Sequence, residues 1–323
     1  MTTATVSVVV ATYNRAQLLH RLVEAIERQQ YDDEIELIVV DDASPDDTWD
    51  ELQRLTAEAA VPLRALRLET NSGPATARNV GWRAATAPHV LFTDDDCIPS
   101  PQWVRGLSDA LRSTDLAQGA TLPNPDQLAN SGPFSRTLVV RKETGYYPTC
   151  NMAYRRDVLE RLDGFDERFR NPAGEDTDLA WRALDAGAAC TFVAEAVVHH
   201  DVRPSNLMTQ LQDTLRWEGV VLAVREHPHL RDKLHRRWFW KPSHPPAIAA
   251  AIGTIVAVTA RSPKGRLAAL ALAAPYVAYR LKRQPIVEDA GLRLAYLPAA
   301  LIADLGEVGV LAWASARYRT VLL

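Results

Sequence analysis

Three consecutive carboxylates, Asp94, Asp95 and Asp96, follow the apolar residues Leu91 and Phe92. Adjacent carboxylates repel one another and raise one another's pKa, so the cluster is costly unless a cation neutralises it. Hard oxygen ligands of this kind suit Mg²⁺ or Mn²⁺, ions that usually keep open positions for substrate phosphates. The triplet therefore favours a divalent-metal site for a phosphate-bearing substrate. The alternative is a solvated acidic turn.

The spacing within the triplet predicts which carboxylates would share a metal ion. On a regular strand, Asp94 and Asp96 point to one face and Asp95 to the other. Imidazole could complete such a site. His199 and His200 end a later apolar segment, although a histidine in that position is more often structural.

The segments around the triplet alternate between strand and helix patterns. Short apolar segments at 6–11, 35–40 and 63–68 predict buried strands, and amphipathic segments between them predict helices. Pro74 is well placed in the first turn of a third helix. Such alternation implies a mostly parallel sheet with right-handed crossovers.

Polar clusters follow three of these strands. Ligands of parallel sheets bind beyond the carboxyl ends of the strands, where Tyr13-Asn14, Asp41-Asp42 and the acidic triplet all fall. Further strands are expected near 119–122, 147–155 and 191–199. An amphipathic helix is expected from Gly174-Glu175-Asp176 to a cap at Gly187.

The composition sets broad limits on the class of protein. The 323 residues suffice for one large domain or two smaller ones, and a net charge of -4 gives no support for nucleic-acid binding. Cys97, Cys150 and Cys190 show no metal or redox spacing, which favours a reducing compartment. The first apolar run, 6–11, is too short for a signal peptide and predicts a first strand.

The last ninety residues differ in composition from the rest. Apolar runs at 247–260 and 267–279 are bracketed by basic residues, with Trp238 and Trp240 at the entry. Neither run reaches the roughly 20 residues of a spanning helix, and the basic turn between them opposes a spanning hairpin. They predict helices that lie in the cytoplasmic leaflet. The alternative is an Ala-rich cap on the catalytic domain.

Six short segments, in this order and spacing, give the chain a resemblance to a known family. They are residues 6–15, 39–44, 71–79, 92–96, 164–169 and 174–179. Over roughly residues 5–230 the chain resembles the nucleotide-sugar-dependent glycosyltransferases of family 2. The resemblance implies an α/β fold of the GT-A type, with a Rossmann-like, mostly parallel sheet flanked by helices. That domain would occupy residues 1–230. Residues 231–323 would form an α-helical, apolar, membrane-associated C-terminal region.

The resemblance also implies how the donor nucleotide would be bound. Thr12, Tyr13 and Arg15 would pack around the nucleotide base, and Asp42 would accept hydrogen bonds from it. The alternative role for Asp42 is that of a turn residue. Arg78 would reach the base or the diphosphate. Its alternative is a solvated arginine on a helix.

Within the acidic triplet, the resemblance gives Asp94 a contact to the ribose or the metal and makes Asp96 a direct metal ligand. Asp95 would belong to the nucleotide-sugar site by supporting the residues that contact the ligand, without itself binding the metal. His200 would touch the metal or the diphosphate. The implied cofactor is Mn²⁺ or Mg²⁺.

Asp176 would be the catalytic base by the same resemblance, since the second acidic residue of that motif deprotonates the acceptor. A neighbouring carboxylate and partial burial would raise its pKa toward the useful range. Helix capping is the alternative role. Asp178 is a second candidate, but it lies two positions further into the helix and would face elsewhere.

Together these features predict a metal-dependent, inverting transfer of a sugar from a nucleotide-sugar donor, with UDP-linked donors the commonest in the family. The acceptor would be a glycan or a lipid-linked hydroxyl compound at the inner membrane leaflet, and the protein would be cytoplasmic and peripheral. A sugar nucleotidyltransferase is one alternative, but the segment 11–15 is not the Gly-rich basic loop that such enzymes carry. Another is a non-catalytic, membrane-associated protein that retains the fold. Intact Asp94, Asp96 and Asp176 argue against it.

Overall fold

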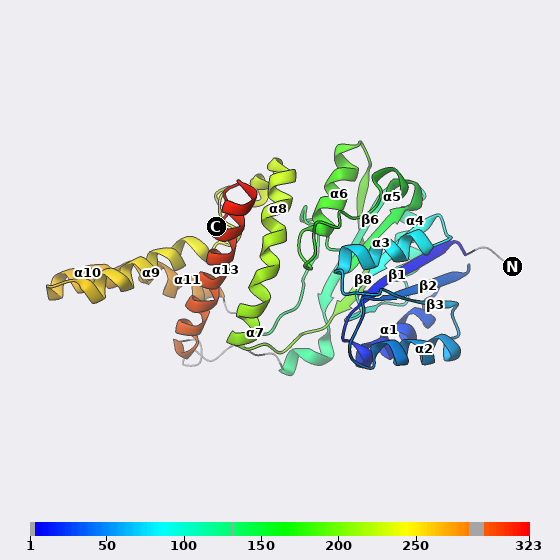
Figure 1. The fold of residues 1–323 in the computed structure, drawn as a ribbon, viewed down its shortest axis with the longest axis horizontal. Coiled ribbons are helices and arrows are strands. Elements are labelled where there is room, and N and C mark those ends of the chain that lie inside the picture. Colours follow the sequence, from blue (N-terminus) through cyan, green and yellow to red (C-terminus); the bar gives the residue numbers. More distant parts are fainter. Residues whose placement is uncertain (1–3, 131, 133, 284–293) are drawn as a thin grey trace. The chain divides into compact units, whose positions relative to one another are not determined.

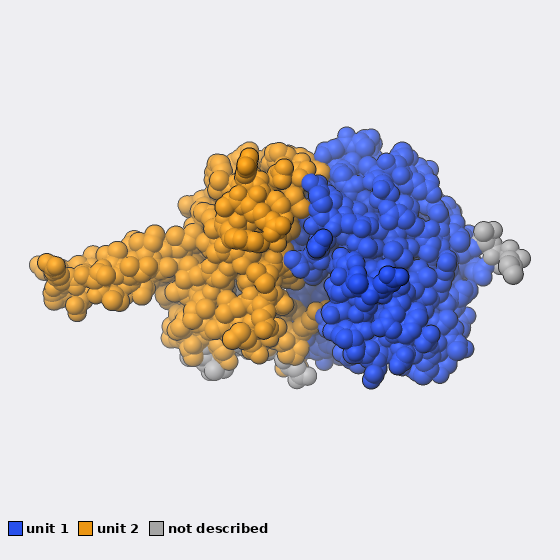
Figure 2. All heavy atoms as spheres, viewed as in Figure 1, with its two compact units in different colours: residues 1–128, 137–202 blue, residues 129–136, 203–323 orange. Residues whose placement is uncertain are grey.

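The computed structural model describes residues 4–130, 132, 134–283 and 294–323. The chain forms two compact units (Figure 2). The first comprises residues 1–128 and 137–202, and the second comprises residues 129–136 and 203–323. The division therefore differs from the predicted boundary at residue 230. The reason is that helices α7 (Leu207–Gln212) and α8 (Glu218–Glu226) pack against α13 (Leu297–Tyr318) in the second unit.

Eight strands form one sheet in the described part of the first unit (Figure 1). They are β1 (Val6–Thr12), β2 (Ile35–Asp41), β3 (Leu63–Arg67), β4 (His89–Thr93), β5 (Cys97–Pro99), β6 (Leu116–Pro123), β7 (Asn151–Arg155) and β8 (Cys190–His200). Their order across the sheet is β3-β2-β1-β4-β7-β6-β8-β5.

The α/β fold class is confirmed, but the sheet is mixed. Strands β3, β2, β1 and β4 are mutually parallel, as predicted. Strand β7 runs antiparallel to both β4 and β6, and β5 runs antiparallel to β8. In the described residues of the long segment between β6 and β7 there is a short 3-10 helix, η1 (Pro125–Asn130), and no α-helix. Without a helical crossover, a parallel pair is not required there.

Helices cover both faces of the sheet. One core contains side chains of α1 (Ala16–Glu27), α2 (Thr48–Glu58) and α4 (Trp103–Ala110). The other contains side chains of α3 (Pro74–Ala84), α5 (Arg156–Leu162) and α6 (Glu175–Asp185).

Strand β1 shows why the first apolar run has no polar alternation. Val8 and Val10 point into the first core, whereas Val9 points into the second. All three are fully buried, and each such burial contributes on the order of 1.5–3 kcal/mol. A strand covered on both faces must be apolar at successive positions. The polar residues that follow β1 therefore mark its end at the edge of the sheet.

The second unit is helical. Besides α7, α8 and α13 it contains η2 (Asp213–Trp217), η3 (Pro228–Lys233), α9 (His244–Thr259), α10 (Pro263–Ala271) and α11 (Ala274–Arg283). The predicted apolar run 267–279 is thus divided between α10 and α11. Helices α9 and α10 pack together as a hairpin. Gly253 permits this approach, because a Cβ there would lie 2.4 Å from the carbonyl oxygen of Ala269.

Helix α13 was not singled out from the sequence. It has 22 residues, and its most apolar 18-residue window has a mean hydropathy of 1.5. Among the described residues it is the one helix long and apolar enough to cross a membrane. Length and composition alone do not separate such a span from the core helix of a folded domain. About a third of that window is buried in the protein.

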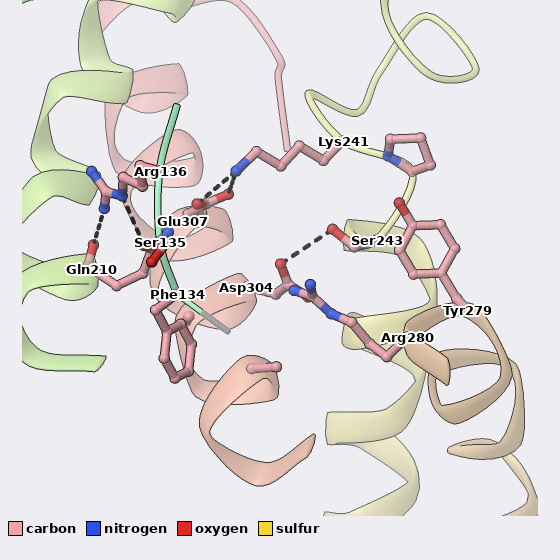
Figure 3. Close-up of a pocket in the computed structure, with 13 residues that line it drawn as sticks. Phe134, Ser135, Arg136, Gln210, Lys241, Ser243, Tyr279, Arg280, Asp304 and Glu307 are labelled. Carbon is pink, nitrogen blue, oxygen red and sulfur yellow. Dashed lines mark hydrogen bonds and ion pairs between the residues drawn. The ribbon is translucent and has the colours of Figure 1, made fainter. Parts of the chain in front are cut away.

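Two carboxylates on α13, Asp304 and Glu307, are buried and fully engaged. Arg280 and Ser243 bind Asp304, and Lys241 binds Glu307 beside a cavity of about 250 Å³ (Figure 3). These partners compensate the charge that burial would otherwise make prohibitive. The polar cluster therefore joins α13 to α11 and to the residues just before α9 within the second unit.

Candidate active site

The candidate residues lie together at the carboxyl ends of the parallel strands. Because β1, β2 and β4 are parallel and adjacent, their carboxyl ends lie together. The backbone N–H of Asp42 donates to the carbonyl of Thr12 at 2.9 Å, which joins the ends of β1 and β2. The acidic triplet begins directly after β4, at Asp94.

The triplet lies in a turn and not on a strand. Strand β4 ends at Thr93, and the turn is closed by a hydrogen bond of 3.1 Å from Cys97 N to Asp94 O. The predicted alternation of side chains along a strand therefore does not apply. Asp95 and Asp96 are buried, and Asp94 is partly exposed.

Asp95 connects the triplet to the loop after β1. Its carboxylate accepts a hydrogen bond of 2.8 Å from the Thr12 hydroxyl and lies 3.9 Å from Arg15 Nε. Burial, together with the neighbouring Asp96, raises the pKa of Asp95 to about 7. Three of the predicted donor-site residues are thus in direct contact, and the shared carboxylate is one that a nearby cation would help to ionise.

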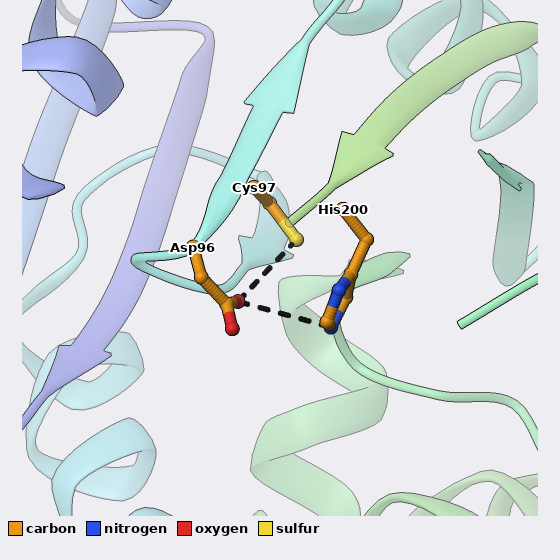
Figure 4. A group of neighbouring side chains, drawn as sticks. All are labelled: Asp96, Cys97 and His200. Carbon is orange, nitrogen blue, oxygen red and sulfur yellow. Dashed lines mark hydrogen bonds and ion pairs between the residues drawn. The ribbon is translucent and has the colours of Figure 1, made fainter. Parts of the chain in front are cut away.

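Asp96 and His200 face each other across the strand ends (Figure 4). His200 Nε2 lies 3.8 Å from Asp96 Oδ1, and the Nδ1–H of His200 donates to the carbonyl of Asp201 at 2.8 Å. That bond places the proton on Nδ1 and leaves the Nε2 lone pair directed at Asp96, the arrangement of a metal-ligating histidine. Asp96, His200 and Cys97 each offer a ligand atom that lies within 4.8 Å of those of the other two. The residues present therefore fit a divalent cation.

Arg78 is buried rather than solvated. Its Nη2 donates to Asp94 Oδ1 and its Nη1 to Glu175 Oε1, both at 2.9 Å. Burial opposes the positive charge, but Asp94 and Glu175 raise the pKa of the guanidinium above its ordinary value. Asp94 is consequently held by Arg78, and the structure does not bring it into the group formed by Asp96 and His200.

Two atoms of this network have unused hydrogen-bonding capacity. Arg78 Nε and Glu175 Oε2 are buried and have no hydrogen-bond partner among the described residues. Buried polar groups in native proteins are almost always paired. A donor and an acceptor left open side by side indicate a place for a polar ligand.

Asp176 lies in the first turn of α6, next to this network. Its Oδ1 accepts a hydrogen bond of 2.7 Å from the backbone N–H of Thr177. Burial, followed by the charge of Glu175, raises the pKa of Asp176 to about 7. Asp178, by contrast, is paired with Arg182 at 2.8 Å. Of the two candidates for a base, Asp176 has the pKa that suits proton transfer near neutrality.

Asp42 supports a loop. Its two carboxylate oxygens accept hydrogen bonds from the backbone of Ser72 and Gly73, at 2.7 and 2.8 Å, and its side chain is buried. Gly73 has a φ of 91°, and a Cβ there would lie 2.2 Å from the carbonyl oxygen of Arg170. Each oxygen of Asp42 could accept one more hydrogen bond. Tyr13, after β1, is 41% exposed and free to stack on a planar ligand.

Ser44 connects two loops and does not cap helix α2. Ser44 accepts a hydrogen bond of 2.9 Å from the backbone N–H of Asn14, and Asp47 is the residue before α2. Ser44 thus joins the loops after β1 and β2. It does so at the edge where the other candidate residues lie.

Sequence reasoning missed the role of two buried polar residues in its own motifs. Glu175 partners Arg78, as described above. Asn79 donates to the carbonyl of Phe165 at 2.9 Å and accepts from its N–H at 2.8 Å. This pair of bonds ties α3 to the segment 164–169, so two of the recognised motifs serve one structural contact.

Comparison with known proteins decides the family. The sequence profile described as Glycosyl transferase family 2 matches residues 7–163, and that described as Glycosyl transferase family group 2 matches residues 89–282. The chain belongs to the family 2 glycosyltransferases. Both profiles cover the acidic turn at residues 94–96, and the first also covers Arg78.

Two relatives of the chain are glycosyltransferases from different organisms. The chain is 30% identical over 245 residues to the pre-mycofactocin glycosyltransferase of Mycobacterium tuberculosis, covering 69% of this chain and 48% of that protein. It is 32% identical over 209 residues to glycosyltransferase AglE of Haloferax volcanii, covering 62% and 67%. The chain thus spans about half the length of the mycobacterial relative.

Solved structures of glycosyltransferases share the fold. Mannosyltransferase PcManGT from Pyrobaculum calidifontis, in complex with GDP-Man and Mn²⁺, has a TM-score of 0.61 at 23% identity, covering 94% of this chain and 87% of that one. S. aureus TarS 1-349, in complex with UDP-GlcNAc, has a TM-score of 0.52 at 18% identity, covering 98% and 92%. The GT-A fold predicted from the motifs is confirmed.

Proposed function

We propose that this protein is a metal-dependent, inverting glycosyltransferase that moves a sugar from a nucleotide-sugar donor to a hydroxyl acceptor. One observation carries the proposal. Arg78 bridges Asp94 of the acidic turn and Glu175 at the start of α6. The buried guanidinium of Arg78 therefore joins the acidic turn, which would hold the donor phosphates, to helix α6, which carries the candidate base Asp176.

The donor would lie along the loops after β1 and β2. Tyr13 offers an exposed aromatic face for a base, and its neighbours Thr12 and Arg15 contact the carboxylate of Asp95. Asp42 would act by holding the loop at Gly73 and by accepting a further hydrogen bond from the base. The ligands named for TarS and PcManGT, UDP-GlcNAc and GDP-Man, support a nucleoside diphosphate sugar. We propose a UDP-linked donor.

Asp96 and His200 would hold the divalent cation, and the Mn²⁺ named for PcManGT supports Mn²⁺ or Mg²⁺. When bound, the ion supplies positive charge that neutralises the diphosphate leaving group. Arg78 would also help to neutralise the diphosphate, because it carries a positive charge and its Nε–H has no acceptor among the described residues. Contact with the diphosphate would let Arg78 release Asp94, whose carboxylate could then reach the ion or the ribose.

Asp176 would remove the proton from the acceptor hydroxyl. The acceptor oxygen would form a bond to the anomeric carbon as the bond from that carbon to the diphosphate oxygen breaks. The departing nucleoside diphosphate takes the electron pair, and the proton stays on Asp176. Attack from the side opposite the leaving group inverts the anomeric carbon. A carboxyl with a pKa of about 7 is half ionised at neutral pH and is matched to this task.

We propose further that the second unit attaches the protein to the cytoplasmic face of a membrane and that the acceptor is a glycan or is lipid-linked. Ile255, Val258 and Leu267, on α9 and α10, are 65%, 77% and 73% exposed. Arg261, Lys264 and Arg266 are close to them in sequence. Apolar side chains next to basic ones suit an anionic lipid surface.

The test of the proposed function is a screen of nucleoside diphosphate sugars for thermal stabilisation that requires Mn²⁺. A donor that binds should raise the melting temperature in Mn²⁺ and not in a chelator. Wild-type protein should be compared with Asp96→Ala. Equal stabilisation of both proteins, with or without metal, would refute the assignment of Asp96 to a metal-dependent donor site.

A further inference from the structure

We infer that Cys97 is a third protein ligand of the cation site, so that the site has an Asp–Cys–His set and an affinity for thiophilic divalent ions such as Zn²⁺, Co²⁺ and Cd²⁺. This inference rests on the proposed metal-dependent function and extends it to the choice of ion. The three ligand groups are Asp96, Cys97 and His200 (Figure 4).

The sheet itself brings Cys97 and His200 together. Strand β5 pairs antiparallel with β8, and in that register Cys97 lies directly opposite His200. Residues directly opposite in an antiparallel pair project their side chains from the same face, about 5 Å apart at Cβ. The two residues are 103 positions apart in the chain. No sequence spacing reveals this pair, and for that reason the three cysteines showed no metal pattern.

The separations between ligand atoms are close to those of a bound ion. Cys97 Sγ and His200 Nε2 each lie 3.8 Å from Asp96 Oδ1, and one ligand atom from each of the three residues lies within 4.8 Å of the other two. In a tetrahedral zinc site, metal–sulfur bonds of about 2.3 Å and metal–nitrogen or metal–oxygen bonds of about 2.0–2.1 Å set ligand atoms roughly 3.3–3.6 Å apart. The two separations of 3.8 Å therefore exceed that geometry by no more than about 0.5 Å.

The surroundings also hold these groups in place. Cys97 and Asp96 are buried, with 1% and 3% exposure. The Nδ1–H of His200 is bound to the Asp201 carbonyl, which leaves Nε2 as the free ligand atom. Binding would form a metal–sulfur bond and release the thiol proton to solvent, with no change of oxidation state.

The chemical consequence is a mixed selectivity. Carboxylate oxygen alone favours Mg²⁺ and Mn²⁺, whereas thiolate and imidazole favour Zn²⁺ and its neighbours. A site with all three ligand types should bind Mn²⁺ through Asp96 and His200 and bind Zn²⁺ or Cd²⁺ more tightly by adding Cys97. Thiophilic ions should therefore displace Mn²⁺ from this protein.

The first test uses the wild-type full-length protein and Co²⁺ as the probe. Cobalt bound to a thiolate should show a sulfur-to-metal charge-transfer absorption in the near ultraviolet, and Zn²⁺ should abolish it by competition. Cobalt that binds in competition with Mn²⁺ but without this absorption would overturn the role of Cys97 and leave the metal-dependent function intact. If neither Co²⁺ nor Mn²⁺ binds, both proposals are refuted.

The second test compares Cys97→Ser with Cys190→Ser. The control cysteine lies at the opposite end of β8 from His200. We expect Cys97→Ser to weaken Zn²⁺ and Cd²⁺ binding by at least about tenfold and to leave Mn²⁺ binding within about twofold, while Cys190→Ser changes neither. Circular dichroism shows whether each variant is folded. Unchanged Zn²⁺ affinity in a folded Cys97→Ser protein would overturn the inference.

Discussion

The guanidinium of Arg78 donates to Asp94 Oδ1 at 2.9 Å, and this bond joins helix α3 to the acidic turn after β4. The same guanidinium reaches Glu175 at the start of α6. Three segments far apart in the sequence therefore depend on one buried charge. Removing that charge would leave two carboxylates near one another without a counterion.

Arg78→Gln should destabilise the protein by about 3–5 kcal/mol, the usual cost of breaking a buried ion pair from one side. Urea denaturation would measure the change in the free energy of unfolding. Arg83→Gln is a matched control on the same helix, because Arg83 forms an exposed ion pair with Asp163 and should cost no more than about 1 kcal/mol. The double variant Arg78→Gln/Glu175→Gln should recover part of the loss. Equal effects of the two single variants would contradict the bridge.

Asp176→Asn should lower turnover by roughly 10²–10⁴, the usual contribution of a positioned base, with donor affinity little changed. Since the pKa of Asp176 is raised to about 7, wild-type kcat/KM should rise with pH through about 7 and then level off. This rise should disappear in the variant. Asp178→Asn breaks the ion pair with Arg182 instead and should reduce stability more than turnover. Loss of donor binding with normal turnover of bound donor would place Asp176 in the nucleotide site.

Asp95→Asn should make the protein less sensitive to alkaline pH. The pKa of Asp95 is raised from 3.8 to about 7, so the folded state binds this proton more tightly than the unfolded chain. The resulting stability is present below about pH 4 and is lost as the pH rises through about 7. In a chelator, the wild-type melting temperature should therefore fall more between about pH 5 and pH 8.5 than that of Asp95→Asn.

A control for that experiment is Asp109→Asn, which alters an exposed ion pair with Arg112. Its pH dependence should follow the wild type. Saturating Mn²⁺ should reduce the difference between wild type and Asp95→Asn, because the ion favours the charged carboxylates nearby. Parallel pH curves for all three proteins in the chelator would show that the charge of Asp95 is not destabilising.

Val258→Asp combined with Leu267→Asp should weaken binding to anionic vesicles by at least about tenfold in a sedimentation assay. Both side chains are strongly exposed on the α9–α10 hairpin, and the new charges would oppose both apolar burial and the lipid charge. High salt should weaken wild-type binding as well. Met208→Asp, on the exposed surface of α7, is the control and should bind like wild type. A wild-type protein that ignores anionic vesicles at low salt would identify the hairpin as part of a soluble cap.

Much of the candidate site at the carboxyl ends of the strands could be predicted from local patterns. Strands β1 and β2 follow from runs of buried apolar residues, and the turns after them follow from the polar residues at their ends, such as Asp42, because these are short-range features. The resemblance also assigned Arg78 and Asp176 to the candidate site, an assignment that stays a prediction. Local patterns do not predict that Arg78 is buried and bonded to Glu175, next to Asp176, because this depends on α3 and α6 packing on the same face of the sheet.

The errors have a common physical origin in long-range pairing. The sequence predicts that Asp94 to Asp96 end a strand. In the structure, β5 pairs with β8 at the outer side of the sheet, so the chain must turn at the triplet to reach β8. The position of Cys97 opposite His200 follows from that same pairing. Helix α13 was overlooked because Asp304 and Glu307 interrupt its apolar pattern, and their partners come from α9 and α11.

Release of nucleoside diphosphate from a bound donor sugar tests the central claim most directly. Wild-type protein, given its donor and acceptor, should release the diphosphate in Mn²⁺ and stop when a chelator is added. Asp96→Ala should remain folded by circular dichroism and show release lowered by at least about 10². The account would be contradicted if Asp96→Ala, or wild type in excess chelator, released the diphosphate at the wild-type rate.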